Sequence, residues 1–138
     1  MSVTSPLLVF FSRSPLCEGL TEDEVSRLYG LFEEKELPEG GTLYREGDTA
    51  DSLFVVLEGQ VQVSREGKSV AEIGPGASIG EMGLFTNARK RSATVTANSP
   101  LTVLRIGRDE FKQALETRQV PGVLVANLAH EVVTRLSR

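Results

Sequence analysis

The hydrophobic pattern near the N-terminus has the period of an amphipathic helix. Apolar residues recur at spacings of three and four between positions 21 and 32, at Val25, Leu28, Leu31 and Phe32. Thr21 and Glu24 open this stretch with the spacing of a capping box, in which each side chain accepts a hydrogen bond from the backbone N–H of the other residue. We therefore predict a helix from Thr21 to about Phe32. A short apolar helix near residues 6–12 is expected to precede it and pack on the core.

From Leu37 onward, apolar and polar residues alternate, which is the period of a half-buried β-strand. Glycine-bearing turns recur every 8–12 residues and separate predicted strands at 42–45, 52–57, 60–64, 69–73, 91–97 and 101–106. Short strands at such regular spacing favour an antiparallel barrel or jelly roll. The helical period returns at 107–117 and again from Pro121 to the end of the chain.

These patterns predict an α+β fold, namely an antiparallel β jelly-roll barrel with flanking N- and C-terminal helices. We place helices at about 6–33, the barrel at about 34–106 and the C-terminal helices at about 107–138. A chain of 138 residues is long enough for one domain with a real core and too short for two. We therefore expect residues 1–138 to form a single domain.

Composition excludes several classes of function. The net charge of −4 argues against a broad nucleic-acid-binding face. Cys17 is the only cysteine and His130 the only histidine, which rules out a thiolate metal cluster, the usual histidine metal sites and a Ser–His nucleophile of standard type. The sequence also shows no motif for phosphodiester hydrolysis. We expect a non-enzymatic binding module without catalytic residues, metal or cofactor.

The sequence also bears on location. No stretch reaches the 18 or so uninterrupted apolar residues that a membrane span needs. The short apolar run at 6–11 has no basic residues before it and does not resemble a signal peptide. We expect a cytoplasmic protein.

The stretch 78–95 carries the candidate chemistry. Gly80 and Gly83 leave the backbone open to a ligand, and the free N–H groups of a single helical turn between them suit an anion. Arg91 lies ten positions after Glu81. A guanidinium can donate two parallel hydrogen bonds to a phosphate, whereas an ionised carboxylate is a pure acceptor that suits a hydroxyl group.

The pattern Gly80-Glu81-Met82-Gly83-Leu84, followed by Arg91-Ser92-Ala93-Thr94-Val95, resembles the phosphate-binding cassette of cyclic nucleotide-binding domains. That family includes catabolite activator proteins, regulatory subunits of cyclic-nucleotide-dependent kinases and domains of gated channels. The resemblance covers about residues 20–118 and implies a short cassette helix and cAMP or cGMP as ligand. It places Glu81 on the ribose 2′-hydroxyl and Arg91 on the cyclic phosphate. Ser92 and the amides near Met82 and Gly83 would complete the phosphate cradle.

The resemblance leaves several points open. Ser92 does not decide between cAMP and cGMP, and the residue that covers the purine is not fixed, with Asn127, Val133, Thr134 and Leu136 as candidates. The expected output is a signal through the C-terminal helix to an effector protein or a second copy in a homodimer. The chain shows no helix-turn-helix after that helix, so we expect no DNA partner. Two alternatives remain: a ligand-free structural or protein-interaction module on the same fold, and a domain for another small anionic effector.

Overall fold

The computed structural model describes residues 9, 11–14, 17–80 and 90–116. Two four-stranded antiparallel sheets make up most of this part of the chain. In the first sheet the strand order is β1-β8-β3-β6, and in the second it is β2-β7-β4-β5. The first sheet comprises β1 (Glu33–Leu37), β8 (Leu101–Gly107), β3 (Ser52–Glu58) and β6 (Ser78–Ile79). The second comprises β2 (Thr42–Tyr44), β7 (Thr94–Ala97), β4 (Val61–Arg65) and β5 (Lys68–Ile73).

The predicted jelly-roll fold is confirmed, with the two sheets facing each other as a sandwich. They are not closed into a barrel, because no ladder of hydrogen bonds joins a strand of one sheet to a strand of the other within the described residues. The turn at 38–41 connects the edge strands of the two sheets. It carries the chain from β1, at the edge of the first sheet, to β2, at the edge of the second.

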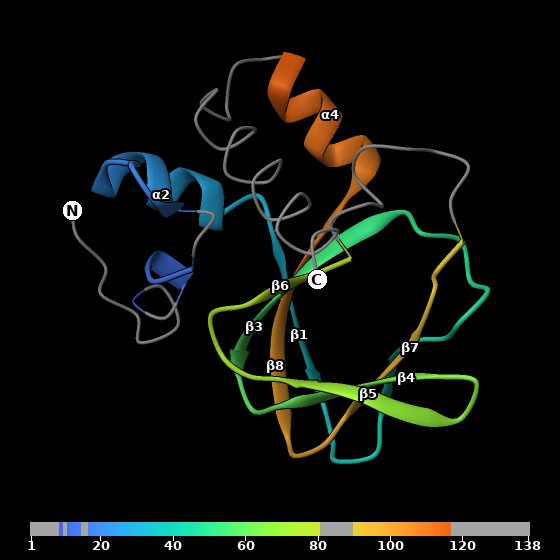
Figure 1. Cartoon of the computed structure of the whole chain (residues 1–138). Coiled ribbons are helices and arrows are strands. Elements are labelled where there is room, and N and C mark those ends of the chain that lie inside the picture. The colour runs from blue at the N-terminus through green and yellow to red at the C-terminus, as the bar shows by residue number, and fades with distance from the viewer. Residues whose placement is uncertain (1–8, 10, 15–16, 81–89, 117–138) are drawn as a thin grey trace.

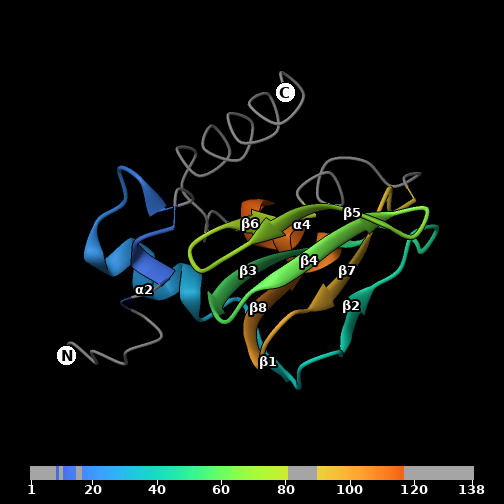
Figure 2. The ribbon, with the colours of Figure 1, turned by 60° about the horizontal axis from the view of Figure 1, so that its bottom comes forward.

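Two helices cover the outer face of the first sheet, namely α2 (Glu22–Tyr29) and α4 (Arg108–Glu116). In Figure 1 both helices lie above the strands, whereas β4 and β5 lie below; in Figure 2 β4 and β5 come to the front. The first sheet is therefore the middle layer of three.

The alternation of side chains along β3 and β8 explains why both strands are hydrophobic almost throughout. Leu53, Val55 and Leu57 of β3 pack with the helices, in a cluster that also contains Val25 of α2 and Phe111 of α4. The alternate residues, Phe54 and Val56, pack against the second sheet with Val61 and Val95. A strand that is buried on both faces needs apolar residues at successive positions. Ser52, which contacts the candidate site residue Arg91, lies at the start of β3 in this middle layer.

The capping box at the start of α2 is confirmed. The Glu24 amide donates to Thr21 Oγ1 over 3.2 Å, and the Thr21 amide donates to Glu24 Oε1 over 2.9 Å. The helix ends at Tyr29 and not at Phe32, because the chain turns at Gly30, which caps the helix. Leu31 and Phe32 lie beyond the helix and pack against the cluster beneath it.

Two strands were not predicted. β1, with the sequence Glu-Glu-Lys-Glu-Leu, is exposed except at Leu37 and carries residues with low β-propensity, so its sequence gives no alternation to detect. Its pairing with β8, from Glu33↔Arg105 to Leu37↔Leu101, is what makes it a strand. β6 contains only Ser78 and Ile79 and pairs with β3. Both lie at edges of the first sheet.

Candidate functional site

The structure places three of the six predicted site residues. Gly80 follows β6 directly, and Arg91 and Ser92 lie just before β7. Arg91 is buried, whereas Ser92 and the preceding Lys90 are exposed. Glu81, Met82 and Gly83 lie outside the described residues, as do the predicted cassette helix and the helix predicted from Pro121 to the end of the chain.

The backbone around Arg91 differs from the predicted strand. We predicted a strand from Arg91, but β7 begins at Thr94. The Arg91 amide donates to the Asp48 carbonyl over 2.7 Å, and the Gly47 amide donates to the Arg91 carbonyl over 2.8 Å. These two bonds join Arg91 to the turn after β2 in place of a regular ladder partner. The side chain thereby starts from a backbone position fixed on both sides.

The guanidinium of Arg91 is held by the first sheet. Its Nη2 donates to both the carbonyl and the hydroxyl oxygen of Ser52, each over 3.0 Å. Ser52 begins β3 and is 2% exposed. Its hydroxyl, which accepts from Arg91, also donates to Asp51 Oδ1 over 3.2 Å. A longer contact of 3.5 Å runs from Nη1 to the Gly80 carbonyl.

Two aromatic rings complete the surroundings of the guanidinium. The Arg91 Cζ atom lies 4.1 Å from the centroid of the Tyr44 ring and 5.9 Å from that of Phe54. The two rings contact each other with centroids 6.0 Å apart. At 4.1 Å the Tyr44 ring makes a close cation–π contact, whereas Phe54 is near the limit of such an interaction.

Gly80 makes room for this arrangement. Its φ of +80° is unfavourable for a residue with a side chain, and a Cβ atom there would lie 2.5 Å from Arg91 Nη1 and 3.1 Å from the Ser52 carbonyl oxygen. We predicted from the sequence that Gly80 opens the backbone to a ligand. In the described structure its lack of a side chain gives space to Arg91.

The charge on Arg91 is incompletely compensated. Only 6% of the residue is exposed, and no carboxylate within the described part of the chain forms an ion pair with it. Burial lowers the pKa of the guanidinium, and the nearby Tyr44 and Asp51 act in the opposite direction. Its Nε is buried and has no hydrogen-bond partner among the residues that the structure describes. A buried cation with a free donor is the arrangement expected of a binding site for an anion.

Sequence reasoning did not identify Ser52 and Tyr44 as part of this site. Ser52 had one available signal, since it is a polar residue at the start of a run that is otherwise apolar. Tyr44 had no such signal, because aromatic residues are common in strands and usually pack in the core. Only the fold brings them to Arg91, which lies 39 positions after Ser52.

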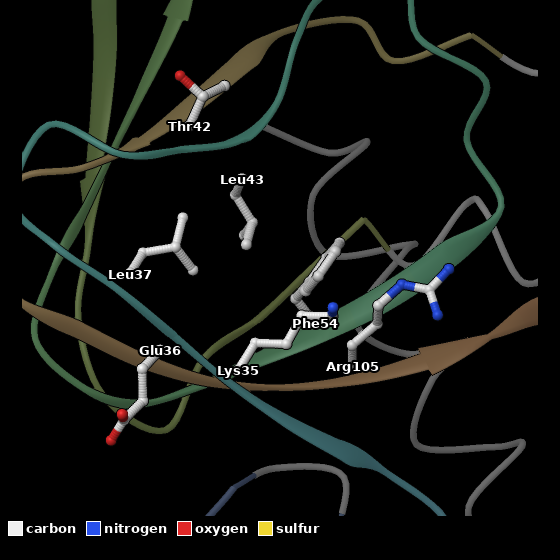
Figure 3. A pocket seen from close by; sticks show the side chains of 7 residues that line it. All are labelled: Lys35, Glu36, Leu37, Thr42, Leu43, Phe54 and Arg105. Carbon is white, nitrogen blue, oxygen red and sulfur yellow. The ribbon is translucent and has the colours of Figure 1, made fainter.

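A separate hollow of about 460 Å³ opens between β1 and β2. Figure 3 shows the apolar side chains of Leu37, Leu43 and Phe54 converging in it, with Glu36 pointing away. Its two cations already have acidic neighbours, with Lys35 Nζ 3.5 Å from Glu33 and Arg105 Nη2 3.8 Å from Asp51. It therefore lacks the uncompensated charge of Arg91, which does not line it.

Fold and site together define a domain of the jelly-roll type with a buried arginine. Residues 34–118 match the family model of the cyclic nucleotide-binding domain, and the chain belongs to this family. The resemblance stated from the cassette residues is thereby confirmed.

Two known proteins are similar to most of this chain. The chain is 30% identical over 128 residues to the cyclic AMP receptor protein of Thermus thermophilus, covering 89% of this chain and 57% of that protein. It is 32% identical over 117 residues to the Pycsar effector protein XpPycTIR of Xanthomonas perforans, covering 83% of this chain and 38% of that protein. The chain thus spans less than two thirds of each of these two relatives.

Among solved structures, the N-terminal domain of a transcriptional regulator from Streptomyces coelicolor A3(2) superposes with a TM-score of 0.77 at 32% identity. The match covers 93% of this chain and 92% of that one. Within the described residues, no helix is long and apolar enough to cross a membrane.

Proposed function

We propose that this chain is a non-enzymatic regulatory module that binds cAMP or cGMP, one molecule per chain, with Arg91 on the cyclic phosphate. The observation that carries the proposal is the buried Arg91 guanidinium, which has no ion pair among the described residues and an unpartnered Nε. A buried cation without a counter-ion is costly. A cyclic phosphodiester supplies one negative charge and two free oxygens, which suit the donors that Arg91 retains.

The remaining roles follow from the family. Glu81 would accept a hydrogen bond from the ribose 2′-hydroxyl, and the amides near Met82 and Gly83 would contact the phosphate. Ser92 is exposed beside Arg91, which suits a hydroxyl that contacts a bound phosphate. The name of the Thermus relative supports cAMP, and cGMP is retained as the second ligand to test.

The proposed output leaves through the C-terminal helix. A ligand can shift a helix only if it binds one position of that helix better than another. We expect the helix to pass this shift to an effector protein or to a second copy of the chain, in the cytoplasm.

Isothermal titration with cAMP, cGMP and linear 5′-AMP tests the proposal. We expect saturable binding of at least one cyclic nucleotide at one site per chain and much weaker binding of 5′-AMP, because its additional charge and open geometry do not match a site for a cyclic diester. At about 100 times the dissociation constant, the ligand should add about 2.7 kcal/mol to the free energy of unfolding. Equal binding of cAMP and 5′-AMP would contradict a cyclic-phosphate site, and no binding of either cyclic nucleotide would favour the ligand-free module.

A further inference from the structure

The buried guanidinium of Arg91 is held in an unusual way. The groups that hold it are the Tyr44 ring and the oxygens of Ser52 and Gly80, none of which is a carboxylate. Buried arginines are commonly paired with a carboxylate, which satisfies the charge and takes up N–H donors. In this site the most direct electrostatic contact is instead the face of an aromatic ring.

An aromatic ring has a distinct consequence for anion binding. Its negative face attracts a cation without accepting the in-plane N–H bonds of the guanidinium. A carboxylate in the same place would occupy two of those donors and compete with any incoming phosphate. The Tyr44 ring therefore stabilises the charge while leaving the Nε donor without a partner among the described residues.

The two sheets contribute different contacts to the guanidinium. Ser52 belongs to β3 of the first sheet, whereas Tyr44 belongs to β2 of the second and is paired with Val95 of β7. Ser52 fixes the Nη2 end of the group through two hydrogen bonds. The Tyr44 ring, with its centroid 4.1 Å from Cζ, limits movement of the group toward the second sheet. Neither contact alone fixes both the position and the orientation.

We propose that Tyr44 is a positioning residue for the anion site, holding the Arg91 guanidinium flat against its ring so that the remaining donors face the ligand. The role in ligand affinity rests on the proposed function, since the anion is the cyclic phosphate. Tyr44 acts through Arg91, and its ring is the part that matters. Tyr44→Phe therefore retains the role, and Tyr44→Leu, of similar apolar character, loses it.

The first test needs no nucleotide. In the free protein, the Nε–H proton signal of Arg91, assigned by its loss in Arg91→Lys, should be shifted upfield by the ring current of Tyr44. We expect the shift to persist in Tyr44→Phe and to disappear in Tyr44→Leu. A signal that is the same in wild type and Tyr44→Leu would overturn the proposed contact.

The second test measures affinity for cAMP and cGMP by titration. Tyr44→Leu should weaken binding about 5- to 30-fold, from the loss of a desolvated cation–π contact, whereas Tyr44→Phe should stay within about 3-fold of wild type. Val61→Ala is the control for general loosening, because Val61 is fully buried in the cluster against which Tyr44 packs. It should lower the melting temperature and leave affinity within about 3-fold.

The outcomes separate the two proposals. Equal affinity losses in Val61→Ala and Tyr44→Leu would show that Tyr44 is only part of the core, and the positioning role would be wrong. If the wild type binds neither nucleotide, the proposed function fails and the affinity role of Tyr44 fails with it. The Arg91 signal would then still decide whether Tyr44 holds the guanidinium.

Discussion

The side chain of Arg91 occupies space that exists only because residue 80 is a glycine. The guanidinium lies beside the Gly80 backbone, and its Nη1 would be 2.5 Å from an added Cβ atom. The site thus depends on a residue that contributes no side-chain chemistry of its own. Residue 80 must lack a Cβ atom and must adopt a positive φ, and a substitution can test both requirements.

Gly80→Ala should weaken ligand binding by about tenfold or more, because the new methyl group displaces the end of the Arg91 side chain. It should also lower the free energy of unfolding by about 1–2 kcal/mol, the cost of a left-handed backbone for a residue with a Cβ. Gly67→Ala is the matched control, with φ +79° and no atom within 4 Å of the added Cβ. It should lose similar stability and keep its affinity. Equal affinities of the two variants, measured by titration, would contradict the steric role.

Arg91 and Glu81 should differ in their importance for binding. Arg91→Ala removes the partner of a desolvated anion and should cost about 2–5 kcal/mol of binding free energy. Glu81→Ala removes a hydrogen bond to a neutral hydroxyl and should cost about 1–3 kcal/mol. Titration of both variants with the same nucleotide decides the order. A larger loss for Glu81→Ala would show that the hydroxyl contact, and not the phosphate contact, dominates affinity.

Among the elements, the layer of helices depends on a buried cluster that includes Cys17. Its thiol donates to the Phe11 carbonyl over 3.3 Å, and burial raises the thiol pKa to about 12 from an ordinary value of about 9. Between these two pH values the unfolded chain loses the thiol proton and the folded chain keeps it. This contribution to stability is therefore fully present below about pH 9 and is lost as the pH rises toward 12.

Denaturant unfolding at pH 8 to 11 measures this effect. The free energy of unfolding of the wild type should fall more steeply with pH than that of Cys17→Ala, with an added slope of at most about 1.4 kcal/mol per pH unit. Tyrosine and lysine residues titrate in both proteins, so only the difference between the two slopes is informative. Parallel slopes would mean that the thiol is accessible enough to ionise in the folded state.

The sequence predicted those elements whose signal is local. The capping box identified the start of α2, and alternation identified β4, because these features depend on neighbouring residues. β1 could not be predicted, since four of its five residues are charged and exposed and only pairing with β8 makes it extended. The start of β7 was misplaced for a similar reason, because the backbone of Arg91 bonds to the distant Asp48.

The same division applies to the candidate site. Arg91 was recognisable because it lies next to Ser92-Ala93-Thr94-Val95 at a fixed distance from Gly80. Its partners Tyr44 and Ser52 were not identified, because they reach Arg91 from opposite sheets and belong to no local motif. A motif therefore located the charged group, and tertiary structure was needed to show how that group is held.

At the scale of the whole molecule, the site joins all parts of the sandwich. Arg91 contacts β3 of the first sheet and β2 of the second, and the first sheet packs through its other face on α2 and α4. β3 supplies both the contact with Arg91, at Ser52, and the apolar residues under the helices, at Leu53 and Val55. Ser52, which contacts Arg91, is thus next in the chain to Leu53, whose side chain packs beneath the helices. If a ligand binds at Arg91, these contacts would connect it to the side chains beneath α2 and α4.

If ligand binding is transmitted through these contacts, the C-terminal segment should respond to it. We expect the amides of residues 119–138 to gain protection from hydrogen exchange when a saturating cyclic nucleotide is added, because the ligand must favour one position of the helix to signal through it. Hydrogen exchange followed by mass spectrometry measures this, with 5′-AMP as the ligand control and Arg91→Ala as the protein control. Protection confined to residues 78–95, with the C-terminal peptides unchanged, would show that this helix does not carry the signal. Protection of those peptides in wild type but not in Arg91→Ala would connect the output to the buried guanidinium.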